Sequence, residues 1–148
     1  MATHIKNRKA TFDYELLDDF EAGAVLYGHE VKSIRTGKAK LEGAYVVVRG
    51  GEAFLVGASI SPYQAANTPE DYDPERARKL LLSKKELAQL SRETDEKGLT
   101  IVPISWYDSG RKLKLKIALG KGKKKADKRE TIKDRDNKRD LDRLMKSQ

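Results

Sequence analysis

The alternation of apolar and polar residues along the chain predicts a protein built mainly from short β-strands. Residues 44–59 predict two strands joined by a tight hairpin, because Gly50 and Gly51 reach the positive φ angles of such a turn without steric penalty. Residues 112–119 alternate with period two and predict a strand with one apolar face and one lysine face. The apolar residues of that strand are Leu113, Leu115, Ile117 and Leu119.

Three further segments add strands and a projecting loop. Residues 11–31 alternate and predict two strands that are interrupted near 21–23. Residues 28–41 predict a short helical turn or loop that projects from the end of a strand. Residues 99–107 predict a buried strand, in which Pro103 favours a sheet edge or a bulge.

One helix is expected from Ser83 to Gly98. Ser83 and Glu86 form a capping box, and Gly98 stands where a left-handed residue ends a helix. Residues 61–75 predict a loop because they contain three of the four prolines. Residues 76–82 predict either the start of a helix or a buried strand.

Together these elements predict a mainly β (α+β) fold, an OB-like small β-barrel of about six strands with flanking helices. Short strands joined by hairpins suit a closed or partly closed barrel, and a sandwich is the alternative because periodicity does not separate the two. We expect a flexible basic N-terminal arm over 1–10, the barrel over 11–119 and a basic C-terminal tail over 120–148.

Positive charge is concentrated in the tail. The chain has a net charge of +8, and residues 120–148 hold twelve Lys or Arg against six Asp or Glu. Basic clusters at 6–9, 32–40 and 121–129 predict a polyanionic partner, with nucleic acid as the first candidate and an acidic membrane as the second. A barrel of this class binds RNA by stacking bases on aromatic rings. The candidate stacking residues, each of which also suits the core, are Phe12, Tyr14, Tyr27, Tyr63, Trp106 and Tyr107.

Several classes of function are disfavoured by what the sequence lacks. It contains no cysteine, which excludes disulfides, thiolate catalysis and cysteine-based zinc sites. His4 and His29 have no partner at metal-ligand or triad spacing, and no P-loop is present. We therefore expect no cofactor, no metal, no small-molecule substrate and no enzymatic activity. The N-terminus resembles no signal peptide and the apolar runs are too short to span a bilayer, so we expect a cytoplasmic protein with no membrane partner.

Glu30 stands directly before the basic cluster at 32–40. A carboxylate in a phosphate-binding site is repelled unless it has a purpose. We expect Glu30 either to accept hydrogen bonds from base amines such as cytosine N4, or to brace Arg35 or Lys32. The alternative is a surface carboxylate in an ordinary ion pair.

Eight motifs follow one another over nearly the whole chain. They are NRKA, DYEL, GHEVKSIRTGKAKL, SISPY, DPERARKLLL, KGLTIVPI, IALGKGKKK and DKRETIK. In this order they resemble the bacterial small protein B family, the SsrA-binding proteins. The combination of EVKSIR, KGLTIVP and DKRETIK is the most specific part of the resemblance.

The resemblance implies a function in ribosome rescue. Members of this family are not enzymes; their OB-type barrel binds the tRNA-like domain of transfer-messenger RNA (tmRNA, or SsrA RNA), and the pair enters stalled ribosomes for trans-translation. Elongation factor Tu, through the shared RNA, is a further implied partner. A generic OB-fold RNA-binding or ribosomal protein is the alternative. The expected RNA-binding residues are Asn7, Lys9, Glu30, Lys32, Ser33, Arg35, Gly37 and Lys38. The expected ribosome-binding residues of the tail are Lys121, Lys123, Lys124, Asp127, Lys128, Arg129, Lys133 and Arg135.

The resemblance also implies that the tail becomes helical in the vacant messenger channel of the ribosome. Opposite charges recur at helical spacing in the tail, for example Glu130 with Lys133 and Asp134 with Lys138. Each pair stabilises a helix by only about 0.2–0.5 kcal/mol. With almost no apolar face to bury, we expect the tail to be disordered when free and to follow a hinge at Gly120 and Gly122.

Overall fold

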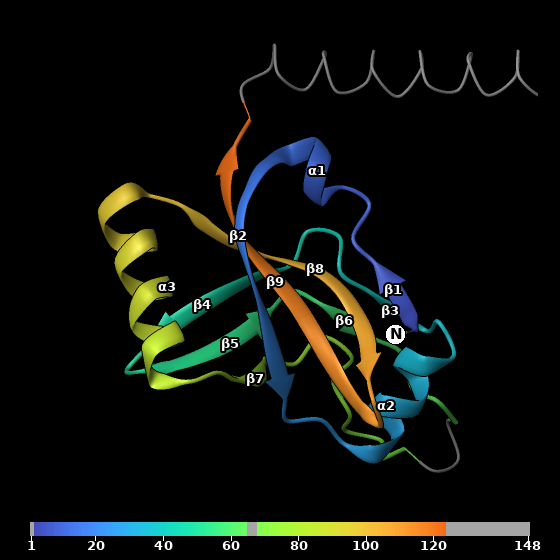
Figure 1. The fold of residues 1–148 in the computed structure, drawn as a ribbon. Coiled ribbons are helices and arrows are strands. Elements are labelled where there is room, and N and C mark those ends of the chain that lie inside the picture. Colours follow the sequence, from blue (N-terminus) through green and yellow to red (C-terminus); the bar gives the residue numbers. More distant parts are fainter. Residues whose placement is uncertain (1, 65–67, 124–148) are drawn as a thin grey trace, which may run out of the picture.

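Strands dominate the structure, a computed structural model that describes residues 2–64 and 68–123 (Figure 1). The elements in chain order are β1 (Thr3–Lys6), α1 (Ala10–Asp13), β2 (Tyr14–Ala24), α2 (Gly28–Arg35), β3 (Ala39–Lys40), β4 (Tyr45–Arg49), β5 (Glu52–Val56), β6 (Ser59–Ile60), β7 (Arg78–Leu81), α3 (Lys84–Lys97), β8 (Thr100–Ser109) and β9 (Lys112–Gly122). The expectation of a mainly β protein with a few helices is confirmed. In the described part of the chain, no helix is long and apolar enough to cross a membrane.

Six of the strands form a closed ring. Their order is β8-β4-β5-β7-β2-β9, each neighbouring pair is antiparallel, and the pairing of β9 with β8 closes the ring. β1 also pairs with β8, whereas β3 and β6 form a separate two-stranded sheet. The register of β8 against β9 shifts between Pro103 and Ser105, where a bulge was one of the two expectations.

The turns and caps with strong local signals lie where the sequence predicts them. The β4–β5 hairpin turns at Gly50 (φ 59°) and Gly51 (φ 74°). At the start of α3, the Glu86 N–H donates to the Ser83 hydroxyl and the Ser83 N–H donates to the Glu86 carboxylate. The helix is followed by Gly98 with φ 64°.

The segment 11–31 differs from the two interrupted strands predicted for it. β2 runs without a break from Tyr14 to Ala24, and the chain then enters α2 instead of a second strand. The Tyr27 N–H donates to the Glu30 carboxylate (2.9 Å), and the Tyr27 carbonyl accepts from the Glu30 N–H (3.0 Å). These two bonds satisfy main-chain groups at the helix start, so they favour a helix over continued alternation.

The N-terminal residues differ from the flexible arm expected over 1–10. Thr3–Lys6 forms β1, which pairs with β8, and the next residue, Asn7, donates its N–H to the Ile104 carbonyl (2.8 Å). The segment is therefore part of the sheet. Its cations hold defined positions on the surface rather than moving on a free arm.

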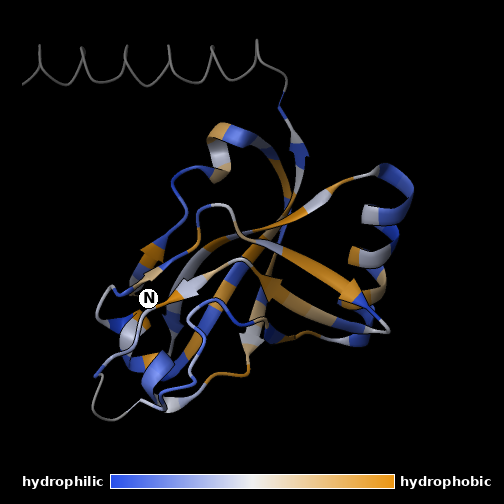
Figure 2. Cartoon of the chain, turned by 180° about the vertical axis from the view of Figure 1, so that it is seen from behind, coloured by the Kyte–Doolittle hydropathy of each residue, from blue (hydrophilic) through white to orange (hydrophobic). Residues whose placement is uncertain are grey.

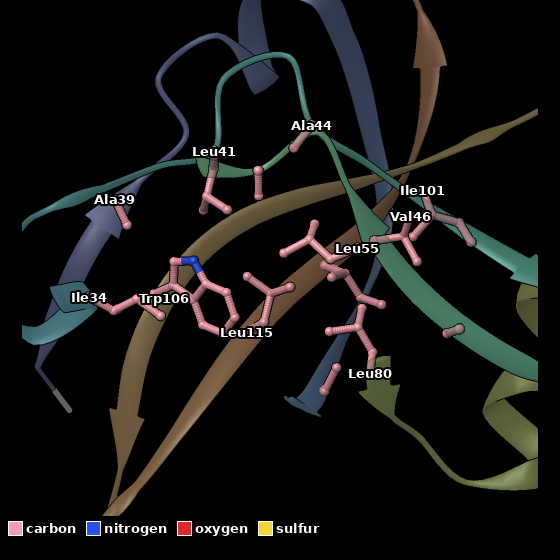
Figure 3. Packing of buried hydrophobic residues seen from close by; sticks show 14 of the residues in the cluster. Ile34, Ala39, Leu41, Ala44, Val46, Leu55, Leu80, Ile101, Trp106 and Leu115 are labelled. Carbon is pink, nitrogen blue, oxygen red and sulfur yellow. The ribbon is translucent and has the colours of Figure 1, made fainter. Parts of the chain in front are cut away.

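One hydrophobic cluster fills the ring (Figure 3). Trp106 is fully buried and lies between Ile34 of α2 and Leu115 of β9. Hydrophobic residues follow the strands, whereas the turns and much of α3 are hydrophilic (Figure 2). Because Ile34 belongs to this cluster, the core holds α2 against the ring and so positions the cations that the helix carries.

β9 extends to Gly122, beyond the domain boundary expected at residue 119. Gly120 is buried inside the strand, where it pairs with both neighbouring strands, so it is not a hinge. A Cβ at Gly120 would lie 3.1 Å from the Cβ of Tyr14, so a larger residue would require Tyr14 to shift by a few tenths of an ångström. The predicted tail from residue 124 onward lies outside the described residues.

Candidate nucleic-acid interface

Two of the basic clusters expected from the sequence meet in the fold. Lys6 and Arg8, from β1 and the residues after it, line the same groove as Lys40 of β3. All three side chains are exposed, and the groove, which we call the basic groove, measures about 680 Å³. Within residues 2–64 and 68–123, its only lining carboxylate is that of Glu42. The fold thus gathers cations that are more than 30 positions apart in sequence into one region of positive potential.

Lys32 and Lys38 share an aromatic neighbour. Their ammonium nitrogens lie 5.9 Å and 5.5 Å from the centre of the Tyr63 ring, within the range of cation–π attraction. Both lysines are exposed and Tyr63 is half-buried, so all three are accessible to a partner. An aromatic ring beside two cations suits a nucleic acid, which offers both bases and phosphates.

Ser33 and Gly37 set the direction of Lys38. Gly37 has φ 80°, its N–H donates to the Ile34 carbonyl (3.1 Å), and the Lys38 N–H donates to the Ser33 carbonyl (2.8 Å). This is the Schellman pattern of a helix C-terminus. Ser33 is fully buried, so the expectation of a direct RNA contact by its side chain does not fit the structure.

Asn7 and Lys9, which we expected to contact RNA together, differ in exposure. The Asn7 side chain is almost buried, and its amide donates to the carbonyls of Pro103 (2.8 Å) and Leu41 (3.4 Å). Asn7 therefore ties the end of β1 to β8 and to the residue after β3. Lys9 is exposed, and its carbonyl accepts the Asp13 N–H (2.9 Å) at the start of α1. Of the two, only Lys9 presents its side chain to a partner.

Glu30 is fully buried, which corrects the expectation that it contacts RNA bases. Its carboxylate accepts hydrogen bonds from Arg78 Nη2 (2.7 Å) and Nε (3.1 Å), from the Arg76 guanidinium and from the Tyr72 hydroxyl (3.0 Å). The alternative of a surface ion pair is also wrong, because the carboxylate is buried. Glu30 was expected to brace Arg35 or Lys32 of its own helix, but it binds Arg76 and Arg78 instead. Glu30 fixes the start of α2 to β7 and to the loop before it.

Arg78 is the residue that the sequence reasoning missed. It is fully buried, and besides Glu30 it donates to the carbonyls of Ala58 and Pro74 (2.9 Å each). Of the two alternatives for 76–82, the structure forms the strand, in which Arg78 and Leu80 face inward. Arg78 lies two positions before Leu80, so in a strand both side chains point to the same, buried face. The sequence could have revealed this only if the segment had first been recognised as a strand.

The environment keeps this cluster in one protonation state near neutral pH. Burial alone would raise the pKa of Glu30, but hydrogen bonds from Arg76, the Tyr27 N–H and Arg78 outweigh it and hold the pKa below its usual value. Burial, together with the neighbouring Glu30 carboxylate, raises the pKa of Tyr72 to about 12. Glu30 therefore stays ionised as an acceptor and Tyr72 stays protonated as a donor.

Arg35 points to the β8–β9 turn and not to Tyr63. Its Nε and Nη2 lie 3.3 Å from Asp108 Oδ1, and Nη2 donates to the Arg111 carbonyl (3.1 Å). Hydrogen bonds from His4 and Arg35 lower the pKa of Asp108. The structure therefore separates Arg35 from Lys32 and Lys38, with which the sequence grouped it.

The aromatic candidates also divide into buried and accessible rings. Trp106 is fully buried in the core, so the expectation of stacking is wrong for this residue. Tyr27 is 55% exposed, and the Arg76 guanidinium lies 4.3 Å from the centre of its ring. Tyr27 and Tyr63 are therefore accessible rings next to cations.

Only the beginning of the predicted ribosome-binding set lies in the described residues. Lys121 is exposed near the end of β9, opposite Glu15 of β2. The Lys123 N–H donates to the Asp13 carbonyl (2.9 Å), so the chain is held to α1 up to this point. The other members lie outside the described residues and are Lys124, Asp127, Lys128, Arg129, Lys133 and Arg135.

Comparisons with known proteins agree over nearly the whole chain. The SsrA-binding protein of Microcystis aeruginosa is 49% identical over 95% of this chain and 91% of its own length. The SsrA-binding protein of Syntrophobacter fumaroxidans is 50% identical over 95% of this chain and 87% of its own length. That of Pseudomonas entomophila is 49% identical over 98% of this chain and 91% of its own length.

A solved structure gives the same result. The chain resembles one described as "tmRNA-SmpB: a journey to the center of the bacterial ribosome", with a TM-score of 0.68 and 40% identity. The match covers 86% of this chain and 93% of the solved one. The family described as SmpB protein matches residues 4–147, and the chain therefore belongs to the SmpB family.

Proposed function

We propose that this chain binds the tRNA-like domain of tmRNA and delivers it to stalled ribosomes for trans-translation and ribosome rescue. Its relatives are SsrA-binding proteins, and the solved relative is described with tmRNA and the bacterial ribosome. The observation that carries the proposal is the exposed surface made by the basic groove and by Lys32, Lys38 and Tyr63. Cations beside an accessible ring suit a folded RNA better than a small substrate.

The residues of the site divide into two roles in this proposal. Exposed cations contact the phosphates of the RNA, and they are Lys6, Arg8, Lys9, Lys32, Lys38 and Lys40. Buried polar residues position those cations without touching the RNA. Glu30 and Ser33 hold α2 and its C-terminal turn, and Asn7 holds the segment between β1 and α1.

The ring of strands suits the OB-like description expected from the sequence. In an OB-like protein, loops and one face of a small closed sheet bind the nucleic acid. The protein would act in the cytoplasm, and elongation factor Tu would join the complex through the shared RNA.

The tail serves as a separate ribosome-binding segment in this proposal. Its cations engage ribosomal RNA in the vacant messenger channel, and the opposite charges at helical spacing favour a helix once the cations are engaged. The proposed ribosome-binding set begins with Lys121 and Lys123, at the end of the described residues. Its other members lie further along the tail.

The RNA surface is tested by measuring tmRNA affinity over a range of salt concentrations. We expect log affinity to fall linearly with log salt, because phosphate neutralisation releases counterions. Lys38→Ala and Lys40→Ala should each weaken binding and make the slope shallower by about 0.7–0.9. Lys85→Ala on α3, an exposed lysine away from this surface, is the matched control. Wild-type slopes in both variants would exclude this surface.

The same measurement on a chain truncated after Lys123 separates the two parts of the proposal. This truncation keeps all of β9 and the bond from Lys123 to Asp13. We expect tmRNA binding to remain and peptide tagging on stalled ribosomes to be lost. Normal tagging would contradict the role of the tail, and equal affinity for tmRNA and an unrelated structured RNA would favour the generic RNA-binding alternative.

A further inference from the structure

A second groove lies between the end of β2, α2, β7 and the β8–β9 turn. We propose that it binds an acidic peptide segment of a partner protein, with apolar side chains in the groove and carboxylates on its rim. This groove, which we call the cationic groove, is distinct from the surface that the proposed function uses. The proposal therefore does not depend on RNA binding.

The floor of the cationic groove is apolar. Leu26, Val31, Leu81 and Leu113 line it, from four different elements or their flanks. Leu81 is 53% exposed, and the other three are half-buried. Isolated exposed apolar residues are common on protein surfaces. Here they gather around one groove of about 460 Å³, where covering them would release water from apolar surface.

The rim of the groove is positively charged. Among the described residues, its charged lining residues are Arg35, Arg111, Lys112 and Lys114, with no carboxylate beside them. Within residues 2–64 and 68–123, no carboxylate forms an ion pair with Arg111, Lys112 or Lys114. Only Arg35 is paired, with Asp108. The groove thus attracts negative charge, and the charges on its rim are available to a partner.

The β8–β9 turn holds two of these cations beside the apolar floor. Ser109 pairs with Lys112, so Gly110 and Arg111 form the tip of the turn. The Arg111 carbonyl accepts from Arg35, which ties the turn to α2. These hydrogen bonds hold the cations of the turn next to α2, which carries both Arg35 and the apolar Val31 of the groove.

This combination fits a peptide better than RNA. In the part of the chain that the structure describes, no aromatic side chain lines the cationic groove, whereas RNA surfaces stack bases on aromatic rings. The RNA backbone has no apolar group that would cover Leu81. A peptide that carries Leu, Ile or Phe among Asp and Glu residues satisfies both the floor and the rim.

The proposal can be tested with random twelve-residue peptides displayed on phage and selected against the full chain. We expect the enriched peptides to contain apolar residues flanked by Asp or Glu. A synthetic copy of an enriched peptide, labelled with a fluorophore, is then titrated with protein variants. Leu81→Asp and Lys112→Glu should each weaken its binding about ten-fold or more. Leu17→Asp (Leu17 is 47% exposed) and Lys85→Glu are matched controls outside the groove and should bind normally.

Each other outcome overturns the proposal. Failure to enrich acidic peptides would show that the groove has no preference for them, and equal binding by Leu81→Asp would place the peptide elsewhere. Displacement of the peptide by tmRNA, together with weaker tmRNA binding by Leu81→Asp, would make the groove an RNA surface. Peptide binding does not depend on tmRNA affinity in Lys38→Ala or Lys40→Ala, so the two proposals fail separately.

Discussion

The two ends of α2 each carry a guanidinium–carboxylate pair, yet the pairs have opposite environments. At the start of the helix, Glu30 and Arg78 are both fully buried and lie 2.7 Å apart. At its end, Arg35 and Asp108 lie 3.3 Å apart with side chains 40% and 23% exposed. The buried pair has further hydrogen bonds on both partners, and the exposed pair is open to water and salt.

This difference separates the charges that position α2 from the charges that α2 presents to a binding partner. A buried pair that loses one partner leaves an uncompensated charge in a medium of low dielectric, which is costly. An exposed pair that loses one partner leaves a hydrated charge. The start of α2 therefore fixes the helix on the ring, and its exposed cation Lys32 remains for partners.

Among changes to the two ion pairs, replacing Arg78 with alanine should destabilise the protein most. The change removes donors from Glu30 and from two carbonyls, so we expect the free energy of unfolding to fall by about 3 kcal/mol or more. Urea unfolding followed by the fluorescence of Trp106, the single tryptophan, measures it. Arg49→Ala, at an exposed position of the β4–β5 hairpin, should change stability by no more than about 0.5 kcal/mol. Equal effects of the two variants would remove the distinction between buried and exposed arginines.

The buried network also marks the limit of what the sequence predicts. The hairpin at Gly50 and Gly51 and the capping box of α3 are formed by residues close in sequence, and both predictions are confirmed. The contacts of Glu30 with Arg78 join positions 48 residues apart. No local pattern encodes that distance, so the sequence grouped Glu30 with the cations that follow it.

The proposed RNA surface shows the same limit. The sequence identifies the lysines because charge is a property of composition, and the structure shows that Lys32, Lys38 and Lys40 are exposed. Their grouping was not predicted. Lys6 and Arg8 lie beside Lys40 because β1 is part of the sheet. The sequence indicated a flexible arm instead.

The start of α2 should contribute to the pH dependence of stability. Because the pKa of Glu30 is lowered in the folded protein, its ionised form stabilises the fold above the usual carboxyl pKa of 4.5. That contribution is lost as the pH falls below 4.5 and through the lowered pKa. We expect Glu30→Gln to destabilise the protein most near neutral pH, and the difference from wild type to shrink in acid. Urea unfolding at several pH values measures this, and a constant difference at all of them would contradict it.

The smallest effect should come from Asp108→Asn at the end of α2. Arg35 keeps its bond to the Arg111 carbonyl, and an asparagine side chain can still hydrogen-bond His4 Nε2, which lies 2.9 Å from Asp108 Oδ2. Both side chains of the Arg35–Asp108 pair reach water, so the lost attraction is replaced by hydration. We expect a shift in the urea midpoint far smaller than that of Arg78→Ala, and one that disappears at high salt because screening weakens the exposed pair in the wild type. The Arg78→Ala effect should persist at the same salt concentration, because a buried pair is poorly screened. An Asp108→Asn effect that is as large and as insensitive to salt would show that both ends of α2 are held by their charges.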